Sequence, residues 1–242
     1  DGPSREVIDL SPLSDAVGRL FSDYDVLAAF WMTVKLTGFS LVGSLVLGTL
    51  LAVMRVSPIP SLQLGGSIYV NLVRNTPLTL IIVGCSLGLY TQLGLVLANP
   101  DSGTFIVDQN FRLAVVGLSL YHAAFVCEAL RSGVNTVPLG QAEAARSIGL
   151  TFTQSLMLVV LPQAFRGAVA PLGNVIIALT KNTTVAATIG VAEASYLMKV
   201  MIEFRPDVLF LIFGVFALGF VCLVLPVGIL MTALSRRLAV AR

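Results

Sequence analysis

Five long apolar stretches, separated by shorter polar segments, dominate the pattern of hydrophobic and polar positions along the chain. A helix that crosses the hydrocarbon core of a bilayer needs about 20 mostly apolar residues, and each stretch offers that length. The first stretch carries no charge from Leu36 to its end. The pattern therefore predicts an all-α, polytopic membrane protein with five transmembrane helices, at residues 28–54, 64–97, 111–130, 165–187 and 208–234.

The second stretch is interrupted near its middle by the polar run Arg74-Asn75-Thr76-Pro77. Proline has no N–H and a fixed φ, so Pro77 frees a backbone carbonyl near Val73 and kinks a helix. One interpretation is a single kinked span whose exposed polar groups line a cavity. The other is an interfacial helix followed by a span, and the sequence leaves both open.

Residues 139–162 are semi-polar and lie between two stretches of membrane-spanning length. Residues 141–148 favour a helix because they hold three alanines, which have the highest helix propensity. Gly149 predicts the end of that helix, since glycine adopts a left-handed conformation at little cost. A second run at 151–160 leads to Pro162, where we expect a bend. The segment therefore predicts a helix–turn–helix along the membrane surface.

Two interpretations of this element remain on physical grounds alone. It is either an amphipathic interfacial helix without a partner or a docking element for another protein. In the second case the small alanines let a groove of the partner approach closely, and Glu143 and Arg146 supply polar contacts at the rim.

Composition confirms the membrane class and narrows the partners. The chain is 56% hydrophobic and 12% charged, with a mean hydropathy of +0.92, whereas soluble domains carry roughly 25% charged residues. The net charge is only +2, and lysine and arginine are dispersed. We therefore expect membrane lipid around the chain and no nucleic-acid partner.

The distribution of lysine and arginine predicts the orientation, because these residues accumulate in cytoplasmic loops. Arg55, Arg131, Arg146 and Arg236 flank or fill alternate loops, whereas residues 94–110 contain neither lysine nor arginine. The N-terminus is therefore expected outside and the C-terminus inside. This divides the chain into an extracytoplasmic segment (1–27), a transmembrane domain (28–235) with the cytoplasmic element 139–162, and a cytoplasmic tail (236–242).

Several kinds of chemistry lack their sequence signals. There is no phosphate loop of the form G-x-x-x-x-G-K-[ST], so we expect no ATP site in this chain. There is no H-E-x-x-H, no C-x-x-C and only one histidine, and the three cysteines all lie in apolar runs. We therefore expect no catalytic residue, no metal and no cofactor, and the chain is interpreted as a conduit or a scaffold.

Charged and polar groups inside the spans are the candidate functional residues, since burying a charge in the bilayer costs several kcal/mol. Arg74 either lines a pathway or ties two helices together, for instance through Glu128. Glu128 and Arg131 can pair locally at i, i+3. Lys35 lies near an end of its span, where its stem can snorkel to the interface.

The other polar groups in the spans leave the same choice between a structural and a pathway role. His122 is expected to donate a hydrogen bond between helices, with ligand contact as the alternative. The run Lys181-Asn182-Thr183-Thr184 is either a snorkelling lysine followed by threonines bonded back to their helix, or part of a translocation cavity.

Residues 143–162 resemble the EAA signature of ABC importer permeases. The order is E-A-A, three residues, G, nine residues, a β-branched residue, one residue and L-P. Here it comprises Glu143-Ala144-Ala145, Gly149, Val159 and Leu161-Pro162, with valine where isoleucine is usual. The resemblance extends over residues 28–235, through the runs VRNTPLTL, EALRSG, GQAEAARS and ALTKNTT. Together these resemble the polar amino-acid branch of the family, and most closely its actinobacterial glutamate permeases.

This resemblance implies an ABC importer type I permease fold whose EAA element sits in a cleft of a separate ATPase. The implied coupling residues are Glu143, Ala144, Ala145, Arg146, Gly149 and Leu150. The candidate pathway residues are Arg74, Asn75, Thr76, His122, Glu128, Lys181, Asn182 and Thr183. For an acidic amino acid, Lys181 or Arg74 is expected to meet the side-chain carboxylate, with Asn182 and Thr183 on its α-groups.

The implied assembly contains a second, similar permease chain, two cytoplasmic ATPase subunits that bind ATP and Mg²⁺, and an external amino-acid-binding protein. It would lie in a bacterial plasma membrane and import a polar amino acid, with glutamate the first candidate. The alternatives are an ion-coupled secondary amino-acid transporter, for which the spans offer only Glu128 and His122, and a membrane scaffold that transports nothing.

Overall fold

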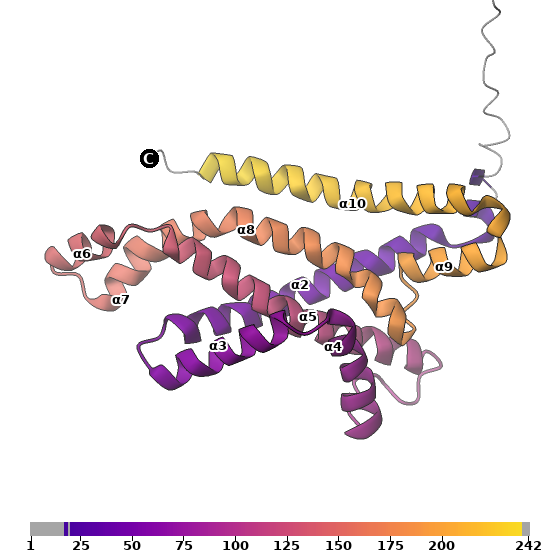
Figure 1. Cartoon of the computed structure of the whole chain (residues 1–242), viewed down its shortest axis with the longest axis horizontal. Coiled ribbons are helices and arrows are strands. Elements are labelled where there is room, and N and C mark those ends of the chain that lie inside the picture. The colour runs from indigo at the N-terminus through magenta and orange to yellow at the C-terminus, as the bar shows by residue number, and fades with distance from the viewer. Residues whose placement is uncertain (1–16, 19, 239–242) are drawn as a thin grey trace, which may run out of the picture.

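Four long helices run side by side along the longest dimension of the molecule (Figure 1). They are α2 (Val26–Val56), α5 (Phe105–Asn135), α8 (Leu161–Asn182) and α10 (Leu209–Leu238). This computed structural model describes residues 17, 18 and 20–238, and that part of the chain contains no β-strand. Each long helix lies in a segment long and apolar enough to cross a membrane. The predicted all-α membrane class is therefore confirmed.

The second apolar stretch is a sharply bent pair of helices. The first member is α3 (Pro60–Arg74); the second is α4 (Leu78–Gly84), continued by the π-helix η1 (Cys85–Gln92). The two members meet at 104°. Pro77 stands at the bend with φ −58° and ψ 135°, because proline cannot donate the hydrogen bond that would continue α3. The break falls where the sequence predicted it, and the pair makes a fifth candidate span if it crosses as one.

The fourth span begins earlier than predicted. Its helix is continuous from the π-helical turn η2 (Leu156–Val160) through α8 into the 3₁₀-helix η3 (Thr183–Ile189). The predicted bend at Pro162 is therefore wrong. Pro162 lies inside this continuous helix, directly after η2, and a local π-helical adjustment lets a membrane helix accommodate a residue without an N–H. α5 and α10 also extend beyond the ranges predicted for them.

Small residues allow α2 and α5 to pack closely. Ser40, Ser44 and Gly48 form a buried stripe on α2, one turn apart. A Cβ atom added to Gly48 would stand 2.5 Å from Cβ of Val126 on α5. In a bilayer, helices associate through this close backbone approach rather than through the hydrophobic effect, so the stripe defines the contact between the two central helices.

α5 and α8 approach each other even more closely near Gly133. A Cβ atom there would collide with the carbonyl of Ala164 and stand 2.8 Å from the backbone N of Ala168. Across the same contact, a Cβ on Gly167 would stand 3.3 Å from Cα of Gly133. Backbone therefore lies against backbone at this point, and the two helices are expected to move as one unit.

The two ends of the molecule carry different short elements. α6 (Leu139–Ser147) and α7 (Phe152–Ser155) project beyond the bundle at one end, here called the α6 end (Figure 1). α9 (Ala194–Phe204) and the 3₁₀-helix η4 (Pro206–Val208) lie at the opposite end, the α9 end. Parts of the two predicted terminal segments lie outside the described residues. These are residues 1–16 and 19 of the segment 1–27, and residues 239–242 of the tail.

Candidate functional site

The segment after α5 forms the predicted helix–turn–helix at the α6 end. α6 ends at Ser147, and Gly149 follows with φ +90°, a conformation that glycine adopts without steric cost. The turn is closed by backbone N–H donors of residues 148, 149 and 150, which bond to the carbonyls of Ala144 (3.3 Å), Arg146 (3.0 Å) and Ala145 (3.2 Å). The helix end predicted at Gly149 is therefore confirmed.

A capping box starts the helix after this turn. The N–H of Gln154 donates to Oγ1 of Thr151 (3.3 Å), and the N–H of Thr151 donates to Oε1 of Gln154 (2.9 Å). These reciprocal bonds satisfy two backbone donors that a helix start otherwise leaves free. The spacing T-x-x-Q signals this capping box in the sequence, but the predicted run at 151–160 did not include it.

The turn presents one large apolar side chain at its tip. Ile148 is 80% exposed, whereas Ala145 of α6 is buried against the rest of the element. Glu143, Ala144 and Arg146 are exposed around the same turn. An exposed isoleucine that follows two charged side chains of α6, on a turn closed by hydrogen bonds, is suited to insertion into an apolar pocket of another protein.

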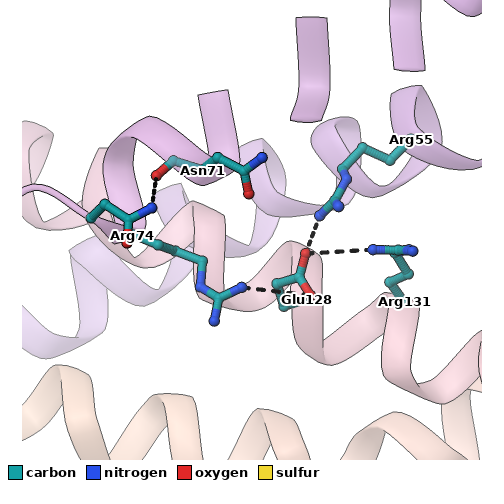
Figure 2. Close-up of polar contacts among 6 residues, drawn as sticks. Arg55, Asn71, Arg74, Glu128 and Arg131 are labelled. Carbon is teal, nitrogen blue, oxygen red and sulfur yellow. Dashed lines mark hydrogen bonds and ion pairs between the residues drawn. The ribbon is translucent and has the colours of Figure 1, made fainter. Parts of the chain in front are cut away.

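A cluster of charges surrounds Glu128 of α5 (Figure 2). Arg55, at the end of α2, donates from Nη1 to Oε1 of Glu128. Arg131 Nη1 lies 3.8 Å from the same oxygen, and Arg74 Nη1 lies 3.8 Å from Oε2. The guanidinium of Arg74 also stands 5.8 Å from the ring centroid of Phe125, within range of a cation–π interaction.

These three arginines differ in how far they are buried. The side chain of Arg55 is 11% exposed, against 44% for Arg74 and 42% for Arg131. Arg55 and Glu128 therefore form the inner tie between α2 and α5, and the other two arginines lie at its margin. The predicted Arg74–Glu128 tie and Glu128–Arg131 pair are both present. Arg55 was missed as a partner because the sequence showed it only as a loop marker.

Asn75 and Thr76 are used locally at the end of α3. Asn75 Nδ2 donates to the carbonyl of Asn71 (2.7 Å), and Thr76 Oγ1 donates to the carbonyl of Leu72 (2.8 Å). Thr76 thus satisfies a carbonyl that has lost its helical donor at the bend, whereas the Asn71 carbonyl also accepts from the backbone N–H of Asn75 (3.3 Å). The two side-chain bonds stabilise the break between α3 and α4, and neither of them involves Glu128.

His122 and Asn182 connect α5 to the end of α8. The His122 side chain is buried, with Nδ1 3.0 Å from the carbonyl of Leu118 and Nε2 3.2 Å from Nδ2 of Asn182. A carbonyl only accepts, so Nδ1 carries the proton and Nε2 accepts from the amide. The expected bond between helices is present, but His122 accepts in it, contrary to the prediction that it donates.

The remaining two pathway candidates lie on α8 and η3. Thr183 is buried, and its hydroxyl donates to the carbonyl of Thr180 (2.8 Å). Lys181 is exposed and lines a groove between α8 and α10. The structure thus brings Arg74 together with Glu128 and His122 with Asn182, but it does not gather all eight candidates into one site.

Glu193 is a buried carboxylate that the sequence analysis overlooked. It precedes α9 and accepts from the N–H groups of Ser195 and Tyr196 (2.9 Å each). Desolvation by burial raises the pKa of Glu193, although these two bonds and the charge of Lys199 oppose the shift. The sequence gives no clear signal for this cap, because glutamate is not among the residues preferred at a helix N-cap.

Fold and site together define a polytopic helical membrane protein with an exposed, hydrogen-bonded turn at one end. Within the described residues, no three His, Cys, Asp or Glu side chains are placed to hold a metal ion. The chain belongs to the family of binding-protein-dependent transport system inner membrane components, whose model matches residues 44–240. The resemblance read from the EAA residues is thereby confirmed.

Individual relatives cover nearly the whole chain. The chain is 55% identical over 217 residues to the glutamate transport system permease protein GluC of Corynebacterium glutamicum, covering 90% of this chain and 95% of that protein. It is 33% identical over 223 residues to the probable glutamine ABC transporter permease protein GlnM of Bacillus subtilis, with 92% and 97% covered.

Solved structures agree on the fold. A chain of an amino acid ABC transporter crystallised with histidines matches with a TM-score of 0.78 at 25% identity, covering 91% of this chain and 97% of that one. An inward-facing MetNI methionine ABC transporter matches with a TM-score of 0.68 at 20% identity. The importer permease fold is therefore shown.

Proposed function

We propose that this chain is one membrane-spanning subunit of an ATP-driven importer of a polar amino acid, with glutamate as its cargo. The observation that carries this proposal is the hydrogen-bonded α6–Gly149–α7 turn with its exposed Ile148. The 55% identity to a glutamate permease over 90% of the chain supports the choice of cargo.

The proposed partners are a cytoplasmic ATPase at the α6 end and an external binding protein at the α9 end. The sequence of this chain has no phosphate loop, so ATP and Mg²⁺ bind to two copies of a cytoplasmic ATPase subunit, which dock at the α6 end. The arginines near this end support a location in the cytoplasm of a bacterial cell, with the N-terminus outside. An external binding protein delivers the amino acid at the α9 end.

A second, similar permease chain completes the pathway as a pseudo-twofold heterodimer. Four long helices and one bent pair are too few to enclose a channel by themselves. Arg74 and Lys181 are exposed cations on different helices, so each can meet a carboxylate of an acidic amino acid at the interface between the two chains.

Motion of the ATPases reaches the spans through α8. The helix runs without a break from η2 into α8, and Gly133 locks α8 to α5. A displacement of the docking turn therefore moves two spans together. ATP binding and hydrolysis then bias the equilibrium between inward-open and outward-open arrangements.

The test is uptake of labelled glutamate by liposomes that contain the assembled importer, with ATP supplied inside or outside. We expect uptake that requires ATP on the ATPase side and persists when ionophores abolish proton and sodium gradients. Uptake driven by an ion gradient without ATP would instead establish the ion-coupled transporter, and no uptake under either condition would leave only a scaffold.

A matched pair of variants tests the docking turn. Ile148→Asp should lower ATPase binding by about 30-fold, because truncating or charging an interface anchor costs about 2 kcal/mol or more, and uptake should fall with it. Ile106→Asp makes the same change at the exposed α9 end of α5 and should leave ATPase binding unchanged. Equal binding by both variants would contradict docking through Ile148.

A further inference from the structure

A groove of about 680 Å³ runs between α8 and α10. Ile177 and Lys181 line it from α8, and Val221, Leu225, Gly228 and Arg236 line it from α10. Most of its wall is apolar, and its two cations stand toward opposite ends. A smaller cavity of about 220 Å³ adjoins it and shares Ile177 and Gly228.

Helix register shows which end of the groove holds Arg236. Gly173 lies against Met231, and Ile177 lies against Gly228, so α8 and α10 are antiparallel neighbours (Figure 1). Arg236 therefore lies toward the α6 end, where α8 begins and where Arg166 is also exposed. By the same register Lys181 lies about level with Val224, and Phe220 and Val221 line the groove beyond it.

The part of the groove between Arg236 and Leu225 has about the length of one membrane leaflet, and the groove continues from there to Phe220. Arg236 and Leu225 are separated by about 16 Å of helix, and half of the hydrocarbon core of a bilayer is about 15 Å thick. If the headgroup of a lipid is near Arg236, its acyl chain lies along Ile229 and Leu225 and ends near the level of Lys181.

The cations around the groove lack an acidic partner within the part of the chain that the structure describes. α8 and α10 carry Arg166, Lys181, Arg236 and Arg237 and contain no aspartate or glutamate. Every ion pair found among residues 17, 18 and 20–238 involves other cations. Arg236 is exposed and has no acidic partner in any of these pairs, so it is available to an anion from outside the chain.

We propose that this groove binds an anionic phospholipid of the leaflet at the α6 end. Arg236 binds the phosphate, since guanidinium groups pair with phosphate through two parallel hydrogen bonds, and the apolar wall takes one acyl chain. Basic pockets between transmembrane helices are recurrent sites for anionic headgroups. The site does not depend on which amino acid is transported, and it leaves Lys181 free for the cargo.

Native mass spectrometry of the full chain tests the proposal. The chain, purified in mild detergent, is titrated with dioleoyl phosphatidylglycerol or dioleoyl phosphatidylcholine. We expect the anionic lipid to bind at lower concentration, and Arg236→Gln to weaken its binding about fivefold, since a basic residue contributes about that factor near a headgroup. Arg237→Gln, which removes the same charge from the neighbouring position outside the groove lining, should change binding less than twofold.

Two further variants separate the site from general surface charge. Arg236→Lys keeps the charge and should retain most of the binding, which also shows that a loss in Arg236→Gln is not misfolding. Gly228→Leu fills the groove without changing charge and should weaken binding of the anionic lipid. Equal binding of the two lipids, or equal effects of Arg236→Gln and Arg237→Gln, would overturn the proposal.

The assembled importer gives the decisive comparison. We expect phosphatidylglycerol to remain bound to the complex after delipidation of the wild type and to be lost with Arg236→Gln. If cysteines placed at Leu225 or Ile229 instead form cross-links to the second permease chain and the complex retains no lipid, the groove is a subunit interface and the lipid site is refuted.

Discussion

α5 and α10 are both long spans, yet they occupy opposite environments. The apolar window of α5 has a mean hydropathy of 1.7 and is 61% buried, whereas that of α10 has a mean hydropathy of 3.1 and is 11% buried. The more hydrophobic helix is thus the less buried one. In a bilayer, hydrophobicity marks the surface that faces lipid or a second subunit, and the protein interior can hold polar groups that pair with one another.

The residues of the two helices show how this difference arises. α5 buries Gln109, Ser119 and His122 and carries Glu128, each bonded to another element or to a backbone carbonyl. The buried residues of α10 are Ile212 and Phe216. α5 is therefore specified by small residues and polar pairs, and α10 by hydrophobicity alone.

The largest effect is expected where α5 meets α8 backbone to backbone. Gly133→Leu should destabilise the fold by about 3 kcal/mol or more, because overpacking that displaces backbone exceeds the usual cost of an inserted side chain. Gly214→Leu on α10 is the matched control, since nothing lies within 4 Å of a Cβ there. Unfolding in detergent, followed by circular dichroism and size exclusion, measures both; similar stability of the two variants would show that α5 is not the packed core.

Side-chain truncation tests the comparison in the apolar parts of the two helices. Leu118 of α5 is fully buried, whereas Leu218 of α10 is 67% exposed. Leu118→Ala should cost about 3 kcal/mol, as large-to-small changes in a packed core do. Leu218→Ala should change the free energy of unfolding by less than about 0.5 kcal/mol. A large loss for Leu218→Ala in the isolated chain would mean that α10 belongs to its core.

The charge cluster should contribute somewhat less than the packed core. Glu128→Gln leaves Arg55 buried without its carboxylate, and we expect the free energy of unfolding to fall by about 2 kcal/mol. Breaking a fully buried pair costs roughly 3–5 kcal/mol. The expected loss is smaller here because the Glu128 side chain is 31% exposed. The double variant Arg55→Gln with Glu128→Gln should recover part of this loss. If it is no more stable than Glu128→Gln alone, the unpaired arginine is not the cause.

The same contrast explains how far the sequence could predict the molecule. Hydrophobic length predicted the spans, and two backbone rules predicted the bend at Pro77 and the turn at Gly149, because these are properties of single residues. Lys35 shows the limit of such single-residue rules. Its ammonium lies 6.0 Å from the ring centroid of Phe111, a contact between helices that the snorkelling prediction did not include. The partner of a buried charge depends on helix packing, which no single residue reports.

The unpredicted parts of the candidate site share this origin. Arg55 and Glu128 are far apart in sequence, and only the small residues of α2 bring them together. The proton position on His122 follows from the Leu118 carbonyl and the Asn182 amide. The π-helical turn before Pro162 had no sequence signal, and it removed the expected bend.

The smallest effect is expected at the tie between α5 and the end of α8. Asn182→Ala removes the donor to His122 and should cost about 1 kcal/mol, the usual range for a hydrogen bond between transmembrane helices. Thr232→Ala on α10 removes a hydroxyl that bonds only within its own helix, to the carbonyl of Gly228, and should cost less. A double-mutant cycle of His122→Ala with Asn182→Ala should give a coupling energy near the single loss. Coupling near zero would mean that the bond does not hold α8 to α5, and the contrast with α10 would then rest on packing and the charge cluster alone.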